Sequence, residues 1–277
     1  MDLDLGGVHV LVTGANGGIG FETTRVFLEQ GAFVTAQYRN SNATLLPLTA
    51  RYDESRLRLT QADLTSEPAV AELFATVPRT VEVLIVNHAV YSGKSMVKDM
   101  TLGRWRDTFE NNLTSSFLVI REYMRKLERG IAINEDKGRF GDRAAVVLIG
   151  STAGKFGETF NADYSATKSA MMYGLTLSLK NEIVMIAPHG RVNCIAPGWV
   201  KTPMATEALT DPSVVYQALA TTPLKKIAEP SDIAQQIAVL ASAKVSGHIS
   251  GQIVMIAGGM EGRLLNHPQD LNLPLNA

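Results

Sequence analysis

A strand-like apolar run that leads directly into a cluster of glycines constrains this chain more than any other feature. Residues 10–20 read VLVTGANGGIG, and a helical pattern follows over residues 21–30. The first turn of a helix carries free backbone N–H groups and a partial positive charge, and a pyrophosphate can approach them only where no Cβ intervenes. The stretch therefore predicts a dinucleotide site, although an ordinary tight turn would explain about half of isolated matches.

Strand-like runs alternate with helical patterns along the rest of the chain. Strands are expected over residues 8–13, 33–37, 57–62, 81–87, 144–149, 191–195 and 252–256. Helices are expected over residues 21–30, 68–76, 102–127, 162–186 and 231–242. Because this alternation requires crossover connections, it predicts an α/β Rossmann fold, a doubly wound parallel sheet of about seven strands with helices on both faces.

The pattern also predicts the domain organisation. No linker or repeat interrupts it, so residues 1–277 are expected to form one dinucleotide-binding and catalytic domain. Residues 129–143, RGIAINEDKGRFGDR, are expected to be a polar surface loop inserted before the fifth strand. The tail at 260–277 has several leucines without periodicity, which leaves packing on a neighbouring subunit and disorder both open.

Composition restricts the partners and the location. The net charge of -1 argues against nucleic acid or an anionic membrane surface as the main partner. No apolar run approaches the roughly 20 residues of a membrane-spanning helix, and no secretory signal is recognisable, so a cytoplasmic protein is expected. The lone Cys194 excludes an internal disulfide and is expected to be a small buried residue, and the scattered histidines predict no metal site.

A tyrosine and a lysine suggest the chemistry. Tyr164 and Lys168 lie four residues apart in YSATK, which places both side chains on one face of a helix. An ammonium at about 4 Å would lower the pKa of a phenol, ordinarily about 10, by nearly three units. The pair is therefore expected to exchange a proton with an alcohol or a carbonyl near neutral pH. Chance alone would give about 0.3 such spacings in this chain, so the motif needs support.

Two further polar residues supply that support. Ser151 follows the strand expected over residues 144–149, at the sheet edge where ligands bind, and its hydroxyl is expected either to donate to a substrate oxygen or to cap a helix. Asn112 lies within the helix expected over residues 102–127, a position that asparagine does not favour. It is expected either to face solvent or to serve the site.

Taken together, these motifs resemble the short-chain dehydrogenase/reductase family over residues 6 to about 259, and its 3-oxoacyl reductase branch in particular. TGANGGIG resembles the family's Thr-Gly-x-x-x-Gly-Ile-Gly signature without a mismatch. The resemblance implies a catalytic tetrad of Asn112, Ser151, Tyr164 and Lys168. In the family the asparagine holds a kink and a water that links the lysine to solvent.

The resemblance also implies cofactor contacts. Asp63 matches the residue that meets the adenine amino group, and Thr202 in APGWVKTPM matches the one that binds the carboxamide. The other implied contacts are Gly14, Asn16, Gly18, Ile19, Gly20, Tyr38, Arg39, Asn40, Leu64, Asn87, Ala89, Tyr164, Lys168, Pro197, Gly198 and Val200. His88 and Val90 depart from the family's Asn-Asn-Ala-Gly motif, so the loop there is expected to run differently, with His88 facing either the cofactor ribose or solvent.

The end of the second strand predicts which nicotinamide cofactor binds. An acidic residue there would favour NAD, but Tyr38 occupies the position and Arg39 follows. Arginine matches a 2′-phosphate with paired hydrogen bonds, and Asn40 adds a donor, so NADP(H) is expected. The neutral Asn16 makes the preference modest, and an ordinary surface arginine is the alternative.

The predicted reaction is hydride transfer between the nicotinamide and a small-molecule carbonyl or secondary alcohol, with Tyr164 as the acid/base. Residues 199–226 predict a largely apolar lid and hence a neutral, partly apolar substrate. The alternatives are a non-catalytic NADP(H)-sensing regulatory protein, an NAD-dependent alcohol or sugar dehydrogenase, and a sugar-nucleotide epimerase or dehydratase, which the glycine spacing disfavours. The resemblance also implies a homotetramer or homodimer that assembles through the two long helices.

Overall fold

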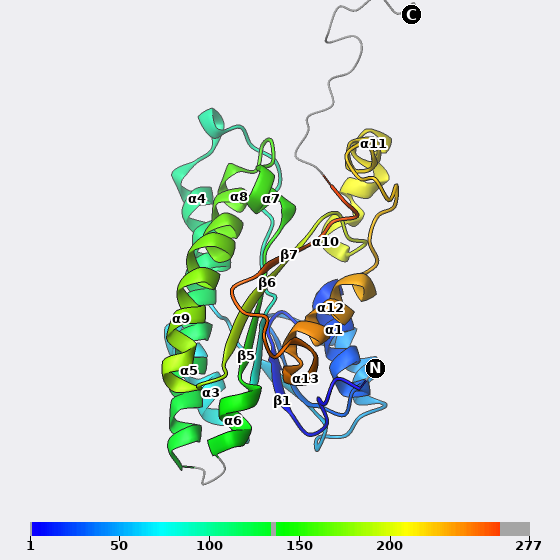
Figure 1. Ribbon diagram of the computed structural model, residues 1–277. Helices are drawn as coiled ribbons and strands as arrows, with labels where there is room; N and C mark the ends of the chain where they lie inside the picture. Colours follow the sequence, from blue (N-terminus) through cyan, green and yellow to red (C-terminus); the bar gives the residue numbers. More distant parts are fainter. Residues whose placement is uncertain (1, 134–136, 261–277) are drawn as a thin grey trace, which may run out of the picture.

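A parallel sheet of seven strands forms the centre of the molecule (Figure 1). The computed structural model describes residues 2–133 and 137–260. The strands are β1 His9–Val12, β2 Phe33–Tyr38, β3 Leu57–Gln61, β4 Val83–Val86, β5 Ala145–Ile149, β6 Arg191–Pro197 and β7 Ile253–Ile256. Their order, β3-β2-β1-β4-β5-β6-β7, reverses direction between β1 and β4. This is the doubly wound arrangement predicted from the sequence, and ligands of such sheets bind where the order reverses.

Each central strand is buried on both faces. In β1, Val10 and Val12 join one core cluster, whereas Leu11 between them joins the cluster on the opposite face. Because successive side chains of a strand point to opposite faces, a doubly covered strand must be apolar throughout. Cys194 in β6 belongs to the second cluster and is fully buried, as expected of a small apolar residue.

Helices form a layer on each side of the sheet (Figure 1). One layer contains α1 Gly18–Glu29 and α12 Pro230–Ala241, and the other contains α3 Glu67–Thr76, α4 Leu102–Phe109, α5 Ser115–Ile133, α8 Ala162–Ser169 and α9 Thr176–Ile186. Shorter helices are α2 Leu46–Thr49, α6 Lys137–Arg143, α7 Thr152–Phe156, α10 Pro203–Thr206, α11 Pro212–Ala220 and α13 Ala243–Ser246. Among the described residues, no helix combines the length and the apolar character that crossing a membrane requires.

A π-helical turn interrupts each of the two long helices expected from the sequence. Glu110–Thr114 separates α4 from α5, and Ala170–Leu175 separates α8 from α9. A π-turn locally widens the helix and is frequently found at functional sites. Asn112 lies inside the first turn, and Lys168 precedes the second by two residues.

Where the structure describes residues 129–143, helices replace the expected loop. Helix α5 continues to Ile133, and α6 occupies Lys137–Arg143. Gly130 suggested a break, but its backbone is helical and packs tightly, since an added Cβ would lie 2.3 Å from the hydroxyl oxygen of Thr80. The residue is therefore small for packing and not for a turn. The tail expected at 260–277 lies outside the described residues beyond Met260.

Candidate active site

The carboxyl ends of the strands open into a cleft of about 1260 Å³. This volume exceeds the roughly 300–1000 Å³ of ordinary small-molecule pockets, so a dinucleotide and a small substrate can fit together. The sequence-predicted residues that line it are Gly14, Asn16, Gly18, Ile19, Arg39, Asp63, Leu64, Asn87, Ala89, Ser151, Tyr164, Lys168, Pro197, Gly198, Val200 and Thr202. Residues from seven separate segments of the chain thus meet in one place.

Two of the cofactor contacts predicted at the end of β2 lie outside the cleft lining. Tyr38 and Asn40 do not line it, and the Tyr38 ring packs against the core cluster on the α1 face. Side chains alternate in direction along an extended strand, so Gln37 and Arg39 face the cleft while Tyr38 between them faces away. The Tyr38 side chain is therefore turned away from the cleft, and the contact expected of Asn40 stays a prediction.

The glycine turn wraps closely around the end of β4. Gly14 has a φ of +60° and donates its N–H to Gln37 Oε1 at 2.9 Å. Asn87 Nδ2 donates to the carbonyl oxygens of Thr13 and Gly14, at 3.0 and 3.1 Å. Gly20 does not line the cleft but closes the turn, because an added Cβ would lie 2.2 Å from the Gly14 oxygen. The turn is thus held in place by its surroundings before any ligand binds.

Helix α1 begins at the cleft with its first N–H groups available. Its N-cap is Gly17, and within the described chain no side chain caps the helix and no acidic residue occupies its first turn. The first N–H groups of a helix have no partner within the helix and attract anions. Thr202 packs over Gly18, whose added Cβ would lie 2.9 Å from the threonine Cγ2. This arrangement fits a dinucleotide pyrophosphate.

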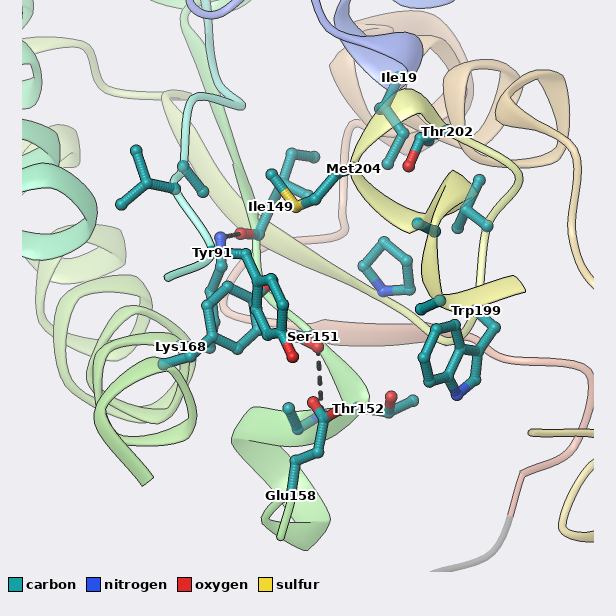
Figure 2. Close-up of a pocket in the computed structure, with 18 of the residues that line it drawn as sticks. Ile19, Tyr91, Ile149, Ser151, Thr152, Glu158, Lys168, Trp199, Thr202 and Met204 are labelled. Carbon is teal, nitrogen blue, oxygen red and sulfur yellow. Dashed lines mark hydrogen bonds between the residues drawn. The ribbon is translucent and has the colours of Figure 1, made fainter. Parts of the chain in front are cut away.

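Ser151, Tyr164 and Lys168 line the cleft beyond the end of β5, and Figure 2 shows Ser151 and Lys168 there. Ser151 is the N-cap of α7, and its Oγ accepts the Ala153 N–H at 3.1 Å. Lys168 Nζ donates to the carbonyl oxygen of Ile149 at 2.7 Å and lies 5.7 Å from the centre of the Tyr164 ring. The helix cap and the functional position expected of Ser151 are therefore compatible, since the cap leaves the hydroxyl at the cleft surface.

The pKa values of the pair differ from the prediction. Burial raises the pKa of Tyr164 to about 12, with a contribution from the Glu158 charge that outweighs the lowering by Ser151. Burial also lowers the pKa of Lys168 from 10.5 to about 8. The expected lowering of the phenol pKa is therefore wrong for the protein alone. The lysine nitrogen is bonded to a main-chain carbonyl and lies over the ring, so its charge does not offset the loss of solvent around the hydroxyl.

Asn112 is fully buried and holds the loop that follows β4. Its Oδ1 accepts the Val90 N–H at 2.7 Å, and its Nδ2 donates to the Val90 carbonyl at 3.1 Å. The side chain therefore does not face solvent, and it is absent from the cleft lining formed by the described residues. The asparagine forms these bonds from the π-turn, a kind of helix distortion at which kinks occur.

His88 lines the cleft, so the contact expected with a cofactor ribose stays a prediction, and its ring nitrogens bond to the protein and not to solvent. Nδ1 lies 2.8 Å from Thr13 Oγ1, and Nε2 lies 2.8 Å from Ser115 Oγ, so both ring nitrogens are engaged inside the protein. Burial and the nearby Lys168 charge lower its pKa to about 3, which keeps the ring neutral. His88 thus links the ends of β1 and β4 to helix α5.

Arg39 lies at the end of the cleft near β2 and β3. It forms an ion pair with Asp63, Nη2 to Oδ2 at 3.3 Å, and donates from Nη1 to Asn111 Oδ1 at 2.9 Å. Asp63 also accepts the N–H and the hydroxyl of Thr65, at 3.1 and 2.8 Å. The turn-forming role considered for Asp63 is therefore present, and its second oxygen remains directed toward Arg39.

Several residues of the cleft were not predicted from the sequence. The ring of Tyr91 stands edge-on to Tyr164, with centroids 6.1 Å apart and an interplanar angle of 83°. Glu158, in the loop after α7, extends into the cleft (Figure 2). Lys94 lines the cleft as well. Their only signal is position, since loops at the carboxyl ends of parallel strands commonly carry binding residues.

This geometry defines an α/β protein with a dinucleotide-sized cleft that is lined by Ser151, Tyr164 and Lys168. A family model described as Enoyl-(Acyl carrier protein) reductase matches residues 14–261. The chain belongs to the short-chain dehydrogenase/reductase family and is an oxidoreductase.

Individual relatives agree with this assignment. The 3-oxoacyl-acyl-carrier-protein reductase MabA of Mycobacterium tuberculosis is 30% identical over 254 residues, which cover 91% of this chain and 92% of that protein. The corresponding reductase FabG of Chlamydia trachomatis is 31% identical over 257 residues, or 90% and 96%. A Brucella melitensis structure titled short-chain dehydrogenase/reductase, glucose/ribitol dehydrogenase, is 28% identical with a TM-score of 0.79, and 94% and 98% are covered.

Proposed function

We propose that this protein is an NADP(H)-dependent oxidoreductase that interconverts a carbonyl and a secondary alcohol, with Tyr164 as the acid/base. The observation that carries the proposal is the position of Ser151, Tyr164 and Lys168 in the same cleft as the glycine turn. The relatives named 3-oxoacyl reductases support a carbonyl as the reacting group.

The cleft offers a site for each part of the cofactor. The first N–H groups of α1 would hold the pyrophosphate, Thr202 the carboxamide, and Asp63 the adenine amino group. Lys168, beneath Tyr164, would hold the ribose near the nicotinamide. When bound, the reduced nicotinamide supplies the hydride that the chain itself lacks.

Ser151 and Tyr164 then serve the substrate oxygen. Both hydroxyls would donate to the carbonyl oxygen, which polarises the carbon toward hydride attack. As the oxygen gains negative charge, Tyr164 transfers its proton to it and becomes a phenolate, which the Lys168 ammonium stabilises. The high pKa of Tyr164 in the protein alone keeps the phenol protonated at neutral pH, the form that reduction requires.

The preference for NADP(H) rests on Arg39. Its guanidinium lies in the cleft and is held by Asp63 and Asn111, so a 2′-phosphate would meet an arginine that is already oriented. Arg39→Asp is expected to reverse the ratio of kcat/KM for NADPH over NADH, whereas Arg51→Asp, an exposed control outside the cleft, leaves it unchanged. An unchanged ratio in Arg39→Asp would show that the arginine does not select the cofactor.

The walls of the cleft indicate the substrate class. Trp199, Met204, Val214 and Phe156 supply apolar surface, while Glu158 is the acidic group nearest Tyr164 that influences its pKa. A neutral, partly apolar ketone or secondary alcohol fits these walls better than a polyanion.

Assembly into a homotetramer or homodimer is part of the proposal. The two long helical segments carry apolar side chains that are exposed in the single chain, among them Phe117, Tyr173 and Met185, with exposures of 47%, 44% and 82%. Such side chains on neighbouring helices mark a surface for association with another copy. Sedimentation of the protein at several concentrations tests it.

The decisive test is a panel of ketones and 3-oxoacyl thioesters assayed by NADPH absorbance. Wild-type protein is expected to consume NADPH, whereas Tyr164→Phe is expected to bind NADPH with unchanged affinity and to lose nearly all turnover. Retained turnover in Tyr164→Phe would contradict the assigned role. NADPH binding without turnover of any carbonyl or alcohol would favour the sensing protein instead.

A further inference from the structure

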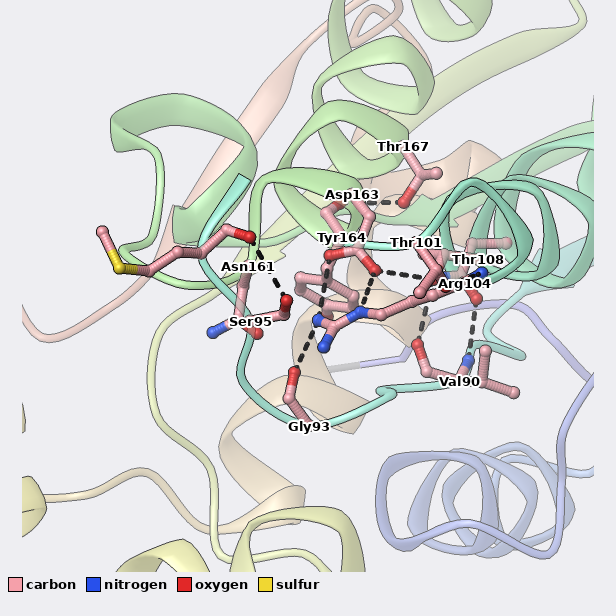
Figure 3. A network of polar contacts seen from close by, with 12 residues as sticks. Val90, Gly93, Ser95, Thr101, Arg104, Thr108, Asn161, Asp163, Tyr164 and Thr167 are labelled. Carbon is pink, nitrogen blue, oxygen red and sulfur yellow. Dashed lines mark hydrogen bonds and ion pairs between the residues drawn. The ribbon is translucent and has the colours of Figure 1, made fainter. Parts of the chain in front are cut away.

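We propose that Arg104 and Asp163 form a positioning pair that holds Tyr91 against Tyr164 and thereby shapes the site for the carbonyl. Neither residue lines the cleft. This inference assigns to Tyr91 the role of a wall of the substrate site beside Tyr164. Its expected effect on kinetics therefore rests on the proposed function. Figure 3 shows the contacts on which it depends.

The pair joins α4 to the start of α8. Arg104 Nε donates to Asp163 Oδ2 at 2.9 Å, and its Nη2 donates to Oδ1 at 3.3 Å. Thr108, one turn further along α4, donates its hydroxyl to Asp163 Oδ2 at 2.9 Å. The Asp163 side chain is 1% exposed and that of Arg104 17%, so solvent screens the pair little. Asp163 directly precedes Tyr164, so the pair fixes the first turn of the helix that carries the tyrosine.

Arg104 also fixes the loop that carries Tyr91. The same Nη2 donates to the carbonyl oxygen of Gly93 at 2.7 Å. Gly93 has a φ of +79°, a conformation that side-chain-bearing residues rarely adopt, and this turn aims its carbonyl at the guanidinium. One arginine therefore bonds both the helix of Tyr164 and the loop of Tyr91.

The loop is attached at three points around Tyr91. Asn112 bonds both backbone groups of Val90, Arg104 bonds Gly93, and the Ser95 N–H donates to the Phe160 carbonyl at 2.8 Å. Tyr91 lies between the first two attachments, with its ring edge-on to Tyr164. Arg104 makes the middle attachment from α4, and the Asn161 amide can donate to the same Gly93 oxygen at 2.9 Å. Loss of the arginine would therefore loosen Tyr91 on the α4 side without disturbing the sheet.

Arginine is needed at this position because of its geometry. Its planar fork presents several N–H groups at fixed angles, which lets it bond a carboxylate and a carbonyl together. A lysine would preserve the charge beside Asp163, but its single nitrogen cannot reproduce the contacts with both carboxylate oxygens and with Gly93. Arg104→Lys therefore keeps the positive charge beside Asp163 but removes the paired hydrogen bonds.

The experiment compares Arg104→Lys and Asp163→Asn with Arg106→Met, an exposed arginine on the same helix. We expect the first two to lower kcat/KM for the carbonyl by about 10- to 100-fold, as for a displacement of about 1 Å at a reacting centre. The KM for the carbonyl is expected to rise. The Kd of NADPH is expected to stay within about twofold of the wild-type value, because the glycine turn proposed to bind the cofactor is distant from Arg104 in the chain. Hydrogen exchange of the amides in residues 91–95 is expected to accelerate. Arg106→Met behaves like wild type in each assay.

Tyr91→Leu tests the same idea with the ion pair left in place. It is expected to reproduce the rise in KM, and the double variant Arg104→Lys with Tyr91→Leu is expected to be no worse than either single change. Additive effects, or an unchanged kcat/KM in Arg104→Lys, would overturn the proposal, as would equal losses of NADPH and carbonyl binding. If wild-type protein turns over no carbonyl, the proposed function fails, while the hydrogen exchange of residues 91–95 still decides whether Arg104 holds the loop.

Discussion

Replacement of Lys168 by methionine is expected to remove catalysis and, at neutral pH, to stabilise the fold. The lysine is 2% exposed, and burial lowers its pKa from 10.5 to about 8. At about 1.4 kcal/mol per pKa unit, the charged form in the folded protein costs about 3 kcal/mol at pH 7. Methionine has a similar length and no charge, so it relieves this cost.

The substitution also removes a hydrogen bond. Lys168 Nζ donates to the Ile149 carbonyl at 2.7 Å, and a buried carbonyl left without that partner costs about 1–2 kcal/mol. Lys168→Met is therefore expected to be more stable than wild type by about 1–2 kcal/mol at pH 7. The difference depends on pH. Between pH 8 and 10.5 the unfolded chain binds more protons than the folded protein, so wild-type stability rises with pH in that window. The stability advantage of Lys168→Met shrinks in that window. It reverses once the lysine is neutral in both the folded and the unfolded protein.

Urea unfolding at pH 7 and pH 10 measures both effects. Wild type and Lys168→Met are compared at one protein concentration, since association would otherwise shift the apparent stability. Lys98→Met is the control, because that side chain is 70% exposed, and its difference from wild type is expected to be small at both pH values. The reasoning would be refuted if Lys168→Met were less stable than wild type at pH 7. It would also be refuted if the difference in unfolding free energy were the same at pH 7 and pH 10.

Two further substitutions test the site. Gly20→Ala is expected to destabilise the fold by about 3 kcal/mol in urea unfolding, because the new Cβ would lie 2.2 Å from the Gly14 oxygen, whereas Gly103→Ala, with only ordinary contacts, has little effect. Equal stabilities of the two variants would contradict the packing argument. Glu158→Gln removes a charge that raises the pKa of Tyr164, so alcohol oxidation is expected to increase at a lower pH than in wild type, by up to about one pH unit. An unmoved pH profile would mean that Glu158 does not act on the phenol.

Local features of the sequence predicted the strands, the glycine turn and the helix face of the proposed site. All seven strands occur where strand-like runs are found, with ends that differ by at most two residues. The runs of β1, β4 and β5 are the clearest, because a strand buried on both faces requires a nearly continuous apolar run. The spacing of Tyr164 and Lys168 placed both on one helix face, since four residues make slightly more than one turn. The glycines predicted the turn that opens onto α1 for an equally local reason, the absence of Cβ atoms.

Other features depend on segments that are distant in the sequence. The side chain of Tyr38 faces away from the cleft, and the role of His88 depends on Thr13 and Ser115, neither of which its own neighbours reveal. The pair of Arg104 and Asp163 is a similar case, since the two residues lie 59 positions apart in the chain.

The sequence by itself determined the order of strands and helices, the glycine turn, and the helix face shared by Tyr164 and Lys168. Each of these features follows from a pattern of residues that are close together in the chain. Only the tertiary structure decided the direction in which the pKa of Tyr164 moves and which loops surround it. Burial and charge act through space, and the groups that bury or charge a side chain come from elements that the chain brings together only when it folds.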